Sequence, residues 1–280
     1  MMYKLLALDL DGTVLNSQHQ ISQPLIKAIK NISNDIVVMI VTGRHHTAAK
    51  PYYDQLNLNS PSICCNGTYI YDYKTATVIK ENAIPKHHAR KFLSLCDQYS
   101  MKKIMYVTDS MLYDQQNPMA HMERLRLWAQ AFPEHDRPSI LRINDFDTPM
   151  NENKYVWKFV VEGEDDNVDE FSKHPFIQAE FNGEQSFINR FDFARKGNTK
   201  GNRLKEYITA LGIEPEQVVA IGDNHNDISM IEIAGLGVTL DHAETAVKDA
   251  ADFIINSNND DQYGLANFIN SLFNQSLSDH

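Results

Sequence analysis

Short, continuous runs of apolar residues alternate with segments of helical periodicity towards both ends of the chain. Such runs are typical of strands that are buried on both faces, and their alternation with helices predicts a doubly wound α/β core built on a parallel sheet. The strands are expected at 4–8, 36–41, 61–65, 218–221, 237–240 and 253–255. The helices are expected at 21–32, 46–56, 199–211, 228–234 and 263–273.

The pattern changes in the middle of the chain, from about Pro85, where helices are interleaved with pairs of short strands. One such pair is expected to turn at Asn182-Gly183, because Asn-Gly is a strong hairpin signal. This mixture predicts a separate α+β domain inserted into the core. Its helices are expected at 86–98 and 119–131, and its strands at 103–107, 111–113, 155–161, 176–181 and 186–191.

The domain boundaries follow from where the first pattern stops and where it resumes. We expect the core domain at 1–84 and 192–280, and the α+β cap domain at 85–191. A chain of 280 residues is long enough for one large domain or for two domains of modest size.

Polar side chains directly follow three of the predicted core strands. Because the carboxyl ends of the strands in an open parallel sheet face one crevice, we expect these side chains to converge although they are far apart in sequence. They are the side chains of Asp9 and Asp11 after the first strand, of Thr42, which Gly43 follows, after the second, and of Asp223, Asn226 and Asp227 after a later one.

The formal net charge of −11 at pH 7 argues against nucleic acid and anionic membrane as partners. The same charge repels a phosphorylated substrate unless a metal ion or a local cation reverses the field at the site. The carboxylates of Asp9 and Asp223 are hard oxygen ligands of the kind that Mg²⁺ prefers. A bound Mg²⁺ would allow a phosphate group to approach these carboxylates.

The spacing of Asp9 and Asp11 suits a two-step hydrolysis, because residues i and i+2 of an extended segment point the same way. One carboxylate can attack phosphorus and form an aspartyl-phosphate, and the other can protonate the leaving oxygen and then activate water. Gly12 allows the chain to turn sharply after Asp11. Taken alone, an acidic turn after a strand is also an ordinary structural feature.

Lys200 lies in the first turn of a predicted helix, where a lysine does not complement the helix dipole. We interpret it as a cation directed at a phosphate group and at the nucleophile, although a solvated surface lysine has the same sequence signature. Thr42 can donate a hydroxyl hydrogen bond to phosphate, and Gly43 can bring its N–H close to a phosphate oxygen.

Four segments resemble, in order, the motifs of the haloacid dehalogenase superfamily of phosphatases: DLDGT, VTGR, Lys200 within NTKG, and GDNHND. The resemblance spans the whole chain. The insert lies between the second and third motifs, where the Cof-type branch of the superfamily carries a large α/β cap. The resemblance implies Asp9 as the nucleophile and Asp11 as the general acid and base.

The resemblance also implies the ligands of the metal ion and of phosphate. Magnesium would be held by the side chains of Asp9 and Asp223 and by the backbone carbonyl of Asp11. Asp227 would hold these ligands in position without binding the metal ion itself. Phosphate would contact the backbone of Leu10 and Gly43 and the side chains of Thr42, Lys200 and Asn226.

Longer strings narrow the resemblance to the bacterial Cof-type pyridoxal phosphate phosphatases, which implies pyridoxal 5′-phosphate as the substrate. One departure is Leu240–Ala243, where the family usually has Gly-Asn-Ala. A sugar-phosphate phosphatase and a phosphomutase stay open, since both share the nucleophile, and so does a non-catalytic phosphate-binding module. The longer strings are VTGRHH, ICCNGTYIYDY, MYV, VWKF and GDN-x-NDISM.

Residues near the motifs are candidates for contacts with the remainder of the substrate. His45 follows the phosphate motif, Asn66-Gly67 follows a core strand, and an aromatic ring such as Trp157 can stack on a pyridine ring. Each has an ordinary alternative, as an exposed helix residue, a hairpin turn or a core aromatic. The candidates are Arg44, His45, Asn66, Gly67 and Trp157.

No run approaches the length of about 18 apolar residues that argues for a membrane helix, and acidic residues follow the apolar N-terminal stretch too early for a secretory signal. The three cysteines, Cys64, Cys65 and Cys96, form neither a zinc motif nor a CxxC pair, and we expect them to be reduced and buried. We therefore expect a cytoplasmic enzyme whose partner is a small phosphorylated metabolite. The oligomeric state is left open.

Overall fold

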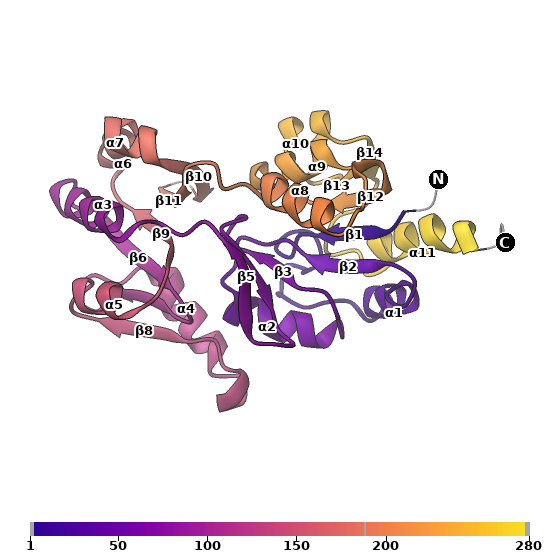
Figure 1. Ribbon diagram of the computed structural model, residues 1–280, viewed down its shortest axis with the longest axis horizontal. Coiled ribbons are helices and arrows are strands. Elements are labelled where there is room, and N and C mark those ends of the chain that lie inside the picture. The colour runs from indigo at the N-terminus through magenta and orange to yellow at the C-terminus, as the bar shows by residue number, and fades with distance from the viewer. Residues whose placement is uncertain (1–2, 188, 278–280) are drawn as a thin grey trace. The chain divides into compact units, whose positions relative to one another are not determined.

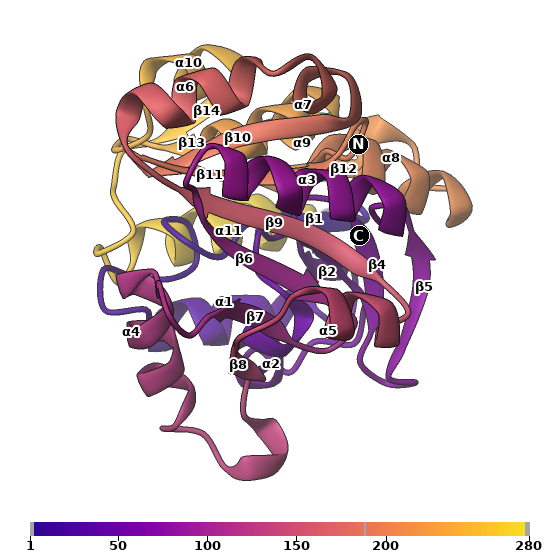
Figure 2. The same ribbon diagram turned by 90° about the vertical axis from the view of Figure 1, so that its left-hand side faces the viewer.

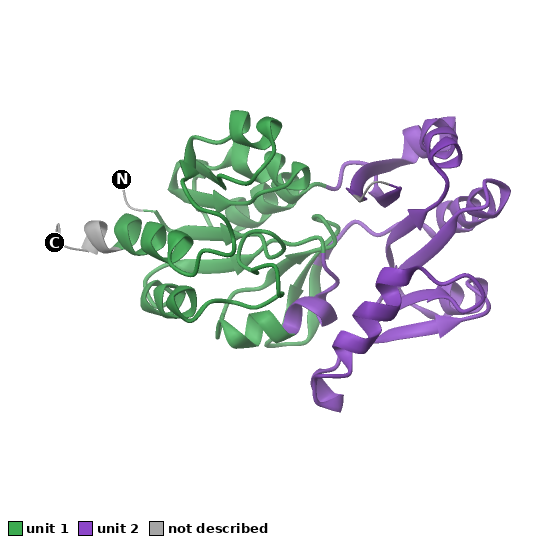
Figure 3. Ribbon diagram, turned by 180° about the vertical axis from the view of Figure 1, so that it is seen from behind, with its two compact units in different colours: residues 1–43, 51–79, 199–280 green, residues 44–50, 80–198 purple. Residues whose placement is uncertain are grey.

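The computed structural model describes residues 3–187 and 189–277. The chain divides into two compact units, which Figure 3 colours separately. Each unit is built on a main sheet of its own. The first unit consists of residues 1–43, 51–79 and 199–280, and the second of residues 44–50 and 80–198.

A five-stranded parallel sheet forms the centre of the first unit, in the order β14-β13-β12-β1-β2. Leu8, at the end of β1, pairs with Ile40 of β2 and with Ile221 of β12. The three strands therefore end level, and the residues that follow them emerge at one edge of the sheet. The strands are β1 (Leu5–Leu8), β2 (Val37–Ile40), β12 (Val218–Ile221), β13 (Leu236–Leu240) and β14 (Phe253–Ile255).

Helices cover both faces of this sheet, and Figure 1 shows α1 and α11 on the opposite side from α8 and α9. Leu204 of α8 and Met230 of α9 pack with Leu5 of β1 in one buried cluster. Ser22 caps α1 by accepting a hydrogen bond from the Leu25 N–H at 3.4 Å. The helices are α1 (Gln23–Ile32), α2 (His46–Gln55, which contributes residues to both units), α8 (Lys200–Ala210), α9 (Ile228–Ile233), α10 (Thr245–Ala250) and α11 (Gly264–Leu277).

A short antiparallel sheet in the order β3-β4-β5 continues from the end of β2. Val41 forms an isolated parallel bridge with Ile63 of β3. The bridge places the loop that follows β3 at the same edge as the residues after β2. The strands are β3 (Ser62–Cys64), β4 (Tyr69–Asp72) and β5 (Thr77–Glu81).

The second unit is built on a six-stranded sheet in the order β10-β11-β9-β6-β7-β8, in which the described pairs are antiparallel except for β7 with β8. Phe92 of α3 stacks on Phe159 of β9, with 4.3 Å between ring centroids, and Figure 2 shows α3 beside β9. The mixed α+β composition expected for the insert is confirmed. The strands are β6 (Lys102–Val107), β7 (Met111–Asp114), β8 (Ile140–Ile143), β9 (Val156–Glu162), β10 (Phe181–Phe187) and β11 (Arg190–Arg195). The helices are α3 (Lys86–Gln98), α4 (Ala120–Ala129), α5 (Asp147–Glu152), α6 (Asp165–Lys173) and α7 (Pro175–Glu180).

The strand expected at 176–181 is wrong, because nearly all of that segment belongs to α7. Pro175 stands at the start of the helix, and the ring of His174 accepts a hydrogen bond from the Phe176 N–H at 3.1 Å. Both features favour a helix start over a strand. The hairpin turn expected at Asn182-Gly183 is also wrong, since both residues lie within β10.

Short elements account for the remaining differences. The periodicity did not predict β8, α5, α6 and α10. The strand expected at 186–191 lies partly outside the described residues, because it includes Ile188. The expected boundary between residues 191 and 192 falls within β11, while the units divide after residues 79 and 198. The division into domains at 1–84, 85–191 and 192–280 stays a prediction.

The helices of both units are short or amphipathic. Among the described residues, no helix has both the length and the apolar composition that crossing a membrane requires. The longest described helix, α11 with 14 residues, is also shorter than the roughly 20 residues that span a bilayer.

Candidate active site

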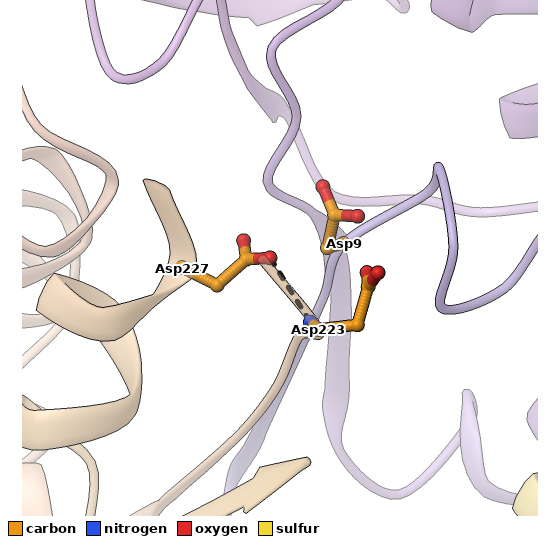
Figure 4. A group of neighbouring side chains, drawn as sticks. All are labelled: Asp9, Asp223 and Asp227. Carbon is orange, nitrogen blue, oxygen red and sulfur yellow. Dashed lines mark hydrogen bonds between the residues drawn. The ribbon is translucent and has the colours of Figure 1, made fainter. Parts of the chain in front are cut away.

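Three aspartates meet where β1 and β12 end. Asp9 follows β1, and its N–H donates a hydrogen bond to the carbonyl of Ile221 in β12 at 3.0 Å. One carboxylate oxygen from each of Asp9, Asp223 and Asp227 lies within 4.8 Å of the others, and Figure 4 shows the three side chains gathered at this point. The convergence expected from the strand ends is therefore present for these residues.

The chain reverses sharply after Asp9. The carbonyl of Leu10 accepts hydrogen bonds from three successive N–H groups, those of residues 13–15, at 3.3, 3.0 and 2.8 Å. Gly12 has a φ of +83°, and a Cβ atom there would lie 2.2 Å from Asp223 Oδ2. Glycine is therefore needed both for the left-handed backbone and for the close approach of the Asp223 carboxylate.

The turn presents two further polar side chains. Thr13 donates through Oγ1 to Asp223 Oδ1 at 2.7 Å, which orients that carboxylate. The side chain of Asp11 is 48% exposed, and its Oδ1 lies 3.8 Å from Nδ1 of His19. An exposed carboxyl group can exchange protons with solvent, as a general acid and base must. Thr13 stands inside the DLDGT motif, but no role was predicted for it.

Lys200 is the first residue of α8, because Thr199 caps the helix by accepting a hydrogen bond from the Asn202 N–H at 3.0 Å. Lys200 Nζ donates to Asp9 Oδ1 at 2.5 Å and to Asp227 Oδ1 at 2.6 Å. Its side chain is 1% exposed. Burial of this kind excludes the alternative of a solvated surface lysine.

Asp227 uses both of its carboxylate oxygens within the protein. Oδ1 accepts from Lys200, and Oδ2 accepts from the N–H groups of Asp223 at 3.1 Å and Asn224 at 3.0 Å; Figure 4 draws the bond to Asp223. A Cβ atom at Gly222 would lie 2.4 Å from the Cβ of Asp227. Asp227 therefore holds Lys200 and the Asp223 backbone in place.

Burial and mutual repulsion shift the pKa values of this cluster. The pKa of Asp9 is raised well above its ordinary value, by burial first and then by the charge of Asp227, against the opposing charge of Lys200. The pKa of Asp223 is raised by burial and by Asp227, in spite of the hydrogen bond from Thr13. Burial lowers the pKa of Lys200, but the charges of Asp227 and Asp9 outweigh it, so the pKa is raised and the lysine stays charged.

The donor set of the cluster fits a hard divalent cation. One lysine does not neutralise three carboxylates, so a further positive charge stabilises their ionised forms. Asp9 and Asp223 each keep one oxygen, Oδ2, that has no hydrogen bond among the described residues. Mg²⁺ is usually bound by one or two carboxylates together with water and substrate phosphate. Asp9 and Asp223 are therefore the side chains able to hold it.

Thr42 and Gly43 follow β2 at the same edge of the sheet. The Thr42 N–H donates to the Ile63 carbonyl at 2.9 Å, and the Thr42 carbonyl accepts from the Asn66 N–H at 3.1 Å. Asn226 Nδ2 donates to Asn66 Oδ1 at 3.1 Å. A Cβ atom at Gly43 would lie 2.8 Å from the same Oδ1. Asn66 thus joins the segments that contain Gly43 and Asn226.

His45 belongs to the second unit, where both of its ring nitrogens have partners. Nε2 contacts the carbonyl of Val107 at 3.0 Å, and Nδ1 contacts Oγ1 of Thr47 at 2.8 Å. The pKa of His45 is lowered well below its ordinary value, by burial first and then by the neighbouring His46. The imidazole is therefore neutral, and its contact with a substrate stays a prediction.

Arg44 and Trp157 also belong to the second unit. The indole N–H of Trp157 donates to the carbonyl of Thr108 at 3.1 Å, and its side chain is fully buried. The guanidinium carbon of Arg44 lies 5.6 Å from the ring centroid of Trp128, as a cation–π contact. Substrate contacts by these two residues stay predictions.

His242 is a neighbour of the cluster that was not predicted as a site residue. Its Nε2 lies 3.5 Å from Asp223 Oδ2. His242 lies within Leu240–Ala243, where the sequence departs from the Gly-Asn-Ala that is usual in the family. That departure is the feature of the sequence that could have indicated a residue near the site.

A family model for the haloacid dehalogenase-like hydrolases matches residues 6–269. The chain is 38% identical over 270 residues to the pyridoxal phosphate phosphatase YbhA of Escherichia coli, covering 96% of this chain and 98% of that protein. It is 28% identical over 261 residues to the 5-amino-6-(5-phospho-D-ribitylamino)uracil phosphatase YcsE of Bacillus subtilis, covering 92% of each. The resemblance stated from the motifs is confirmed.

Solved structures share the fold over nearly the whole chain. A haloacid dehalogenase-like hydrolase from Bacteroides thetaiotaomicron matches with a TM-score of 0.82 at 26% identity, covering 97% of this chain and 100% of that one. A haloacid dehalogenase-like hydrolase from Bacillus subtilis matches with a TM-score of 0.80 at 26% identity, covering 95% and 98%. The predicted fold class, a parallel-sheet core with an inserted α+β domain, is confirmed.

Proposed function

This chain belongs to the haloacid dehalogenase-like hydrolase family and is a phosphatase, and we propose that it hydrolyses pyridoxal 5′-phosphate in a magnesium-dependent reaction. The observation that carries the chemistry is the buried contact of Asp9 with Lys200, beside Asp223 and Asp227. This contact fixes the Asp9 carboxylate at the end of β1 with the ammonium group of Lys200 beside it.

In the proposed reaction the Asp9 carboxylate attacks the phosphorus atom, and the bond from phosphorus to the ester oxygen breaks. Asp11 gives its proton to the leaving oxygen, which departs as the alcohol. Asp11 then takes a proton from water, which attacks the aspartyl-phosphate, releases inorganic phosphate and restores Asp9. The exposed position of Asp11 supports this exchange.

The remaining residues bind and orient the phosphate group in this proposal. Mg²⁺ held by Asp9, Asp223 and the carbonyl of Asp11 would offset the negative field and stabilise charge on the phosphate oxygens. Lys200 compensates charge on the same group, and Asp227 keeps Lys200 in place. The phosphate donors are the backbone N–H groups of Leu10 and Gly43, the hydroxyl of Thr42 and the amide of Asn226.

The choice of substrate is supported by the relative at 38% identity that is named for pyridoxal phosphate. A second substrate, 5-amino-6-(5-phospho-D-ribitylamino)uracil, is favoured by a relative at 28% identity that is named for it. Both esters carry the same phosphate group, so the chemistry at Asp9 is common to the two. They differ in the group that leaves.

A phosphate-release panel with Mg²⁺ tests the substrate. It should include pyridoxal 5′-phosphate, the ribitylaminouracil ester and several sugar phosphates. We expect the highest kcat/KM for pyridoxal 5′-phosphate. A sugar phosphate turned over with a higher kcat/KM would exclude it as the preferred substrate, and an isomerised ester without free phosphate would indicate a phosphomutase.

The variant Asp9→Asn tests the nucleophile. We expect kcat to fall by on the order of 10⁴-fold or more, because the attacking group of the covalent step is lost. The matched control is Asp249→Asn, an exposed aspartate of the same unit, for which we expect kcat close to wild type. Turnover by Asp9→Asn near the wild-type rate would refute the assignment.

A further inference from the structure

The loop between β3 and β4 has an unusual backbone. Cys65, Asn66 and Gly67 have φ values of +50°, +55° and +86°. Residues other than glycine seldom adopt this left-handed conformation, and a two-residue hairpin turn needs φ above zero at no more than two positions. Three such residues in succession indicate that contacts with the rest of the protein maintain this backbone, as happens where a loop positions a functional side chain.

The loop is fixed on two sides within the first unit. The Asn66 N–H donates to the Thr42 carbonyl at 3.1 Å. Arg203 of α8, which is 4% exposed, donates through Nε to the Gly67 carbonyl at 2.8 Å. A Cβ atom at Gly67 would lie 2.1 Å from the carbonyl oxygen of Thr199. The loop is therefore packed between the segment after β2 and the first turn of α8.

This packing places the Asn66 side chain between two segments of the phosphate site. Its Oδ1 accepts a hydrogen bond from Asn226 Nδ2 at 3.1 Å and faces Gly43. Asn226 Oδ1 is buried and has no hydrogen-bond partner among the described residues. The ionised phosphate oxygens of an ester accept hydrogen bonds, so this oxygen needs a donor such as water, whereas Nδ2 has a second hydrogen that a phosphate oxygen can accept. A Cβ atom at Gly43 would lie 3.7 Å from the same Nδ2, so the amide nitrogen lies beside the segment after β2.

We propose that Asn66 is a positioning residue, which holds the Asn226 amide so that the second hydrogen of Nδ2 is directed at the phosphate group of the substrate. The inference rests on the phosphate-binding role proposed above for Asn226 and Gly43. It differs from a direct contact between Asn66 and the substrate, because the effect of Asn66 passes through Asn226.

The variant Asn66→Gly tests this role, because glycine adopts the left-handed backbone readily and removes only the side chain. We expect the inhibition constant of inorganic phosphate to rise by about 10-fold, as for the loss of a hydrogen bond to a charged group. The KM values of pyridoxal 5′-phosphate and p-nitrophenyl phosphate should rise by the same factor, because the phosphate group is common to both.

Asn57→Gly is the matched control. Asn57 has a φ of +51°, lies in the same unit and is exposed at the end of α2. The substitution repeats the backbone change of Asn66→Gly away from the site. We expect its inhibition constant for phosphate to stay within about twofold of wild type, since an exposed amide here makes no contact of that kind.

A double-mutant cycle separates positioning from a general structural role. If Asn66 acts through Asn226, the variant Asn66→Gly/Asn226→Ala binds phosphate no more weakly than Asn226→Ala alone. Additive losses would overturn the proposal, and so would an unchanged inhibition constant in Asn66→Gly. If Asn226→Ala binds phosphate as tightly as wild type, Asn226 does not bind phosphate, and the proposal that Asn66 positions it is refuted as well.

Calorimetric titration of inorganic phosphate into the same variants needs no turnover. A failure of pyridoxal 5′-phosphate as substrate therefore leaves this test intact. Far-ultraviolet circular dichroism of each variant verifies that it is folded. If Asn66→Gly does not fold, Asn66→Ser takes its place in the cycle, because its side chain is one bond shorter and does not reach the Asn226 amide.

Discussion

Both units bury a lysine against aspartate, yet the two lysines have different surroundings. In the first unit Lys200 contacts Asp9 and Asp227, and Asp223 completes a cluster of three carboxylates. In the second unit Lys158 donates to Asp192 and lies 4.7 Å from the ring centroid of Tyr106. Among the described residues, a group of three acidic or metal-binding side chains whose ligand atoms all lie within 4.8 Å of one another occurs only in the first unit.

We infer from this contrast that a buried ion pair needs further uncompensated charge beside it before it indicates a reactive site. Lys158 lies in the middle of β9, where the sheet and its aromatic neighbours enclose it. Lys200 begins α8, and its ammonium group lies among the carboxylates that follow β1 and β12. These carboxylates carry more negative charge than one lysine neutralises, and that excess is the physical reason to bind a cation, which then allows a phosphate group to approach. The two lysines should therefore respond differently to the same substitution.

The largest contrast is expected between Lys200→Met and Lys158→Met. Lys200→Met leaves buried carboxylates without their cation, and we expect kcat to fall by on the order of 10³-fold and the free energy of unfolding by about 3–5 kcal/mol. Lys158→Met leaves Asp192, which is 16% exposed, and should cost about 1–3 kcal/mol. Its kcat on p-nitrophenyl phosphate should stay within about threefold of wild type. Equal losses of kcat in the two variants would contradict the inferred difference between Lys200 and Lys158.

Metal binding gives the next largest effect on the free energy of unfolding. Chelation by EDTA should abolish turnover, because the carboxylates then repel the phosphate group. Mg²⁺ at 100 times its Kd should raise the free energy of unfolding by about 2.7 kcal/mol. Urea unfolding followed by circular dichroism measures the increase, which should disappear in Asp223→Asn and persist in Asp249→Asn. Equal stabilisation of Asp223→Asn and wild type would place the metal elsewhere.

Asp9 in the first unit and His121 in the second should change the free energy of unfolding in opposite directions as pH rises. The pKa of Asp9 is raised in the folded protein, so without Mg²⁺ its contribution to the free energy of unfolding falls as pH rises from 3.8 through the raised value. Burial first, and then Arg190, lower the pKa of His121 in the second unit to about 4. His121 is therefore neutral when folded, and its contribution is present above pH 6.5 and lost as pH falls towards 4.

Tryptophan fluorescence isolates the second unit, because the two tryptophans, Trp128 and Trp157, both lie there. We expect the contribution of His121 to the stability measured by this probe to fall by up to about 2 kcal/mol between about pH 6.5 and about pH 5. His45, whose pKa is also lowered by burial, adds to the fall, so His121→Gln should reduce the dependence without abolishing it. A pH dependence in His121→Gln as steep as in wild type would show that other groups cause it.

The elements of the first unit could be predicted where local signals agree. The strands β1, β2 and β12 are continuous apolar runs, and Ser22 and Thr199 cap helices near the starts of the expected ranges. In the second unit the Asn182-Gly183 signal favoured a pair of strands that included Phe176–Phe181, while Pro175 and His174 start a helix. Here the local helix-start signal prevails over the pattern of apolar residues, so that pattern alone does not decide which element forms.

The same limit applies to the candidate site. Asp9 and Asp223 were predictable because parallel strands place their ends at one edge. The contact of Asn66 with Asn226 depends on three successive left-handed residues, and the approach of His242 to Asp223 depends on the loop between β13 and α10. Neither follows from spacing, since both arise from contacts between distant loops.

The smallest effect is expected from His242→Asn, which restores the amide usual at this position. Its Nε2 is 3.5 Å from Asp223 Oδ2, longer than an ordinary hydrogen bond of about 2.7–3.2 Å, and we expect Mg²⁺ affinity to change by about twofold. Thr13→Val removes the 2.7 Å bond to the other oxygen and should weaken Mg²⁺ binding by about 10–100-fold. Calorimetric titration of Mg²⁺ compares the two variants. If His242→Asn loses more affinity than Thr13→Val, the imidazole and not the hydroxyl orients the Asp223 carboxylate.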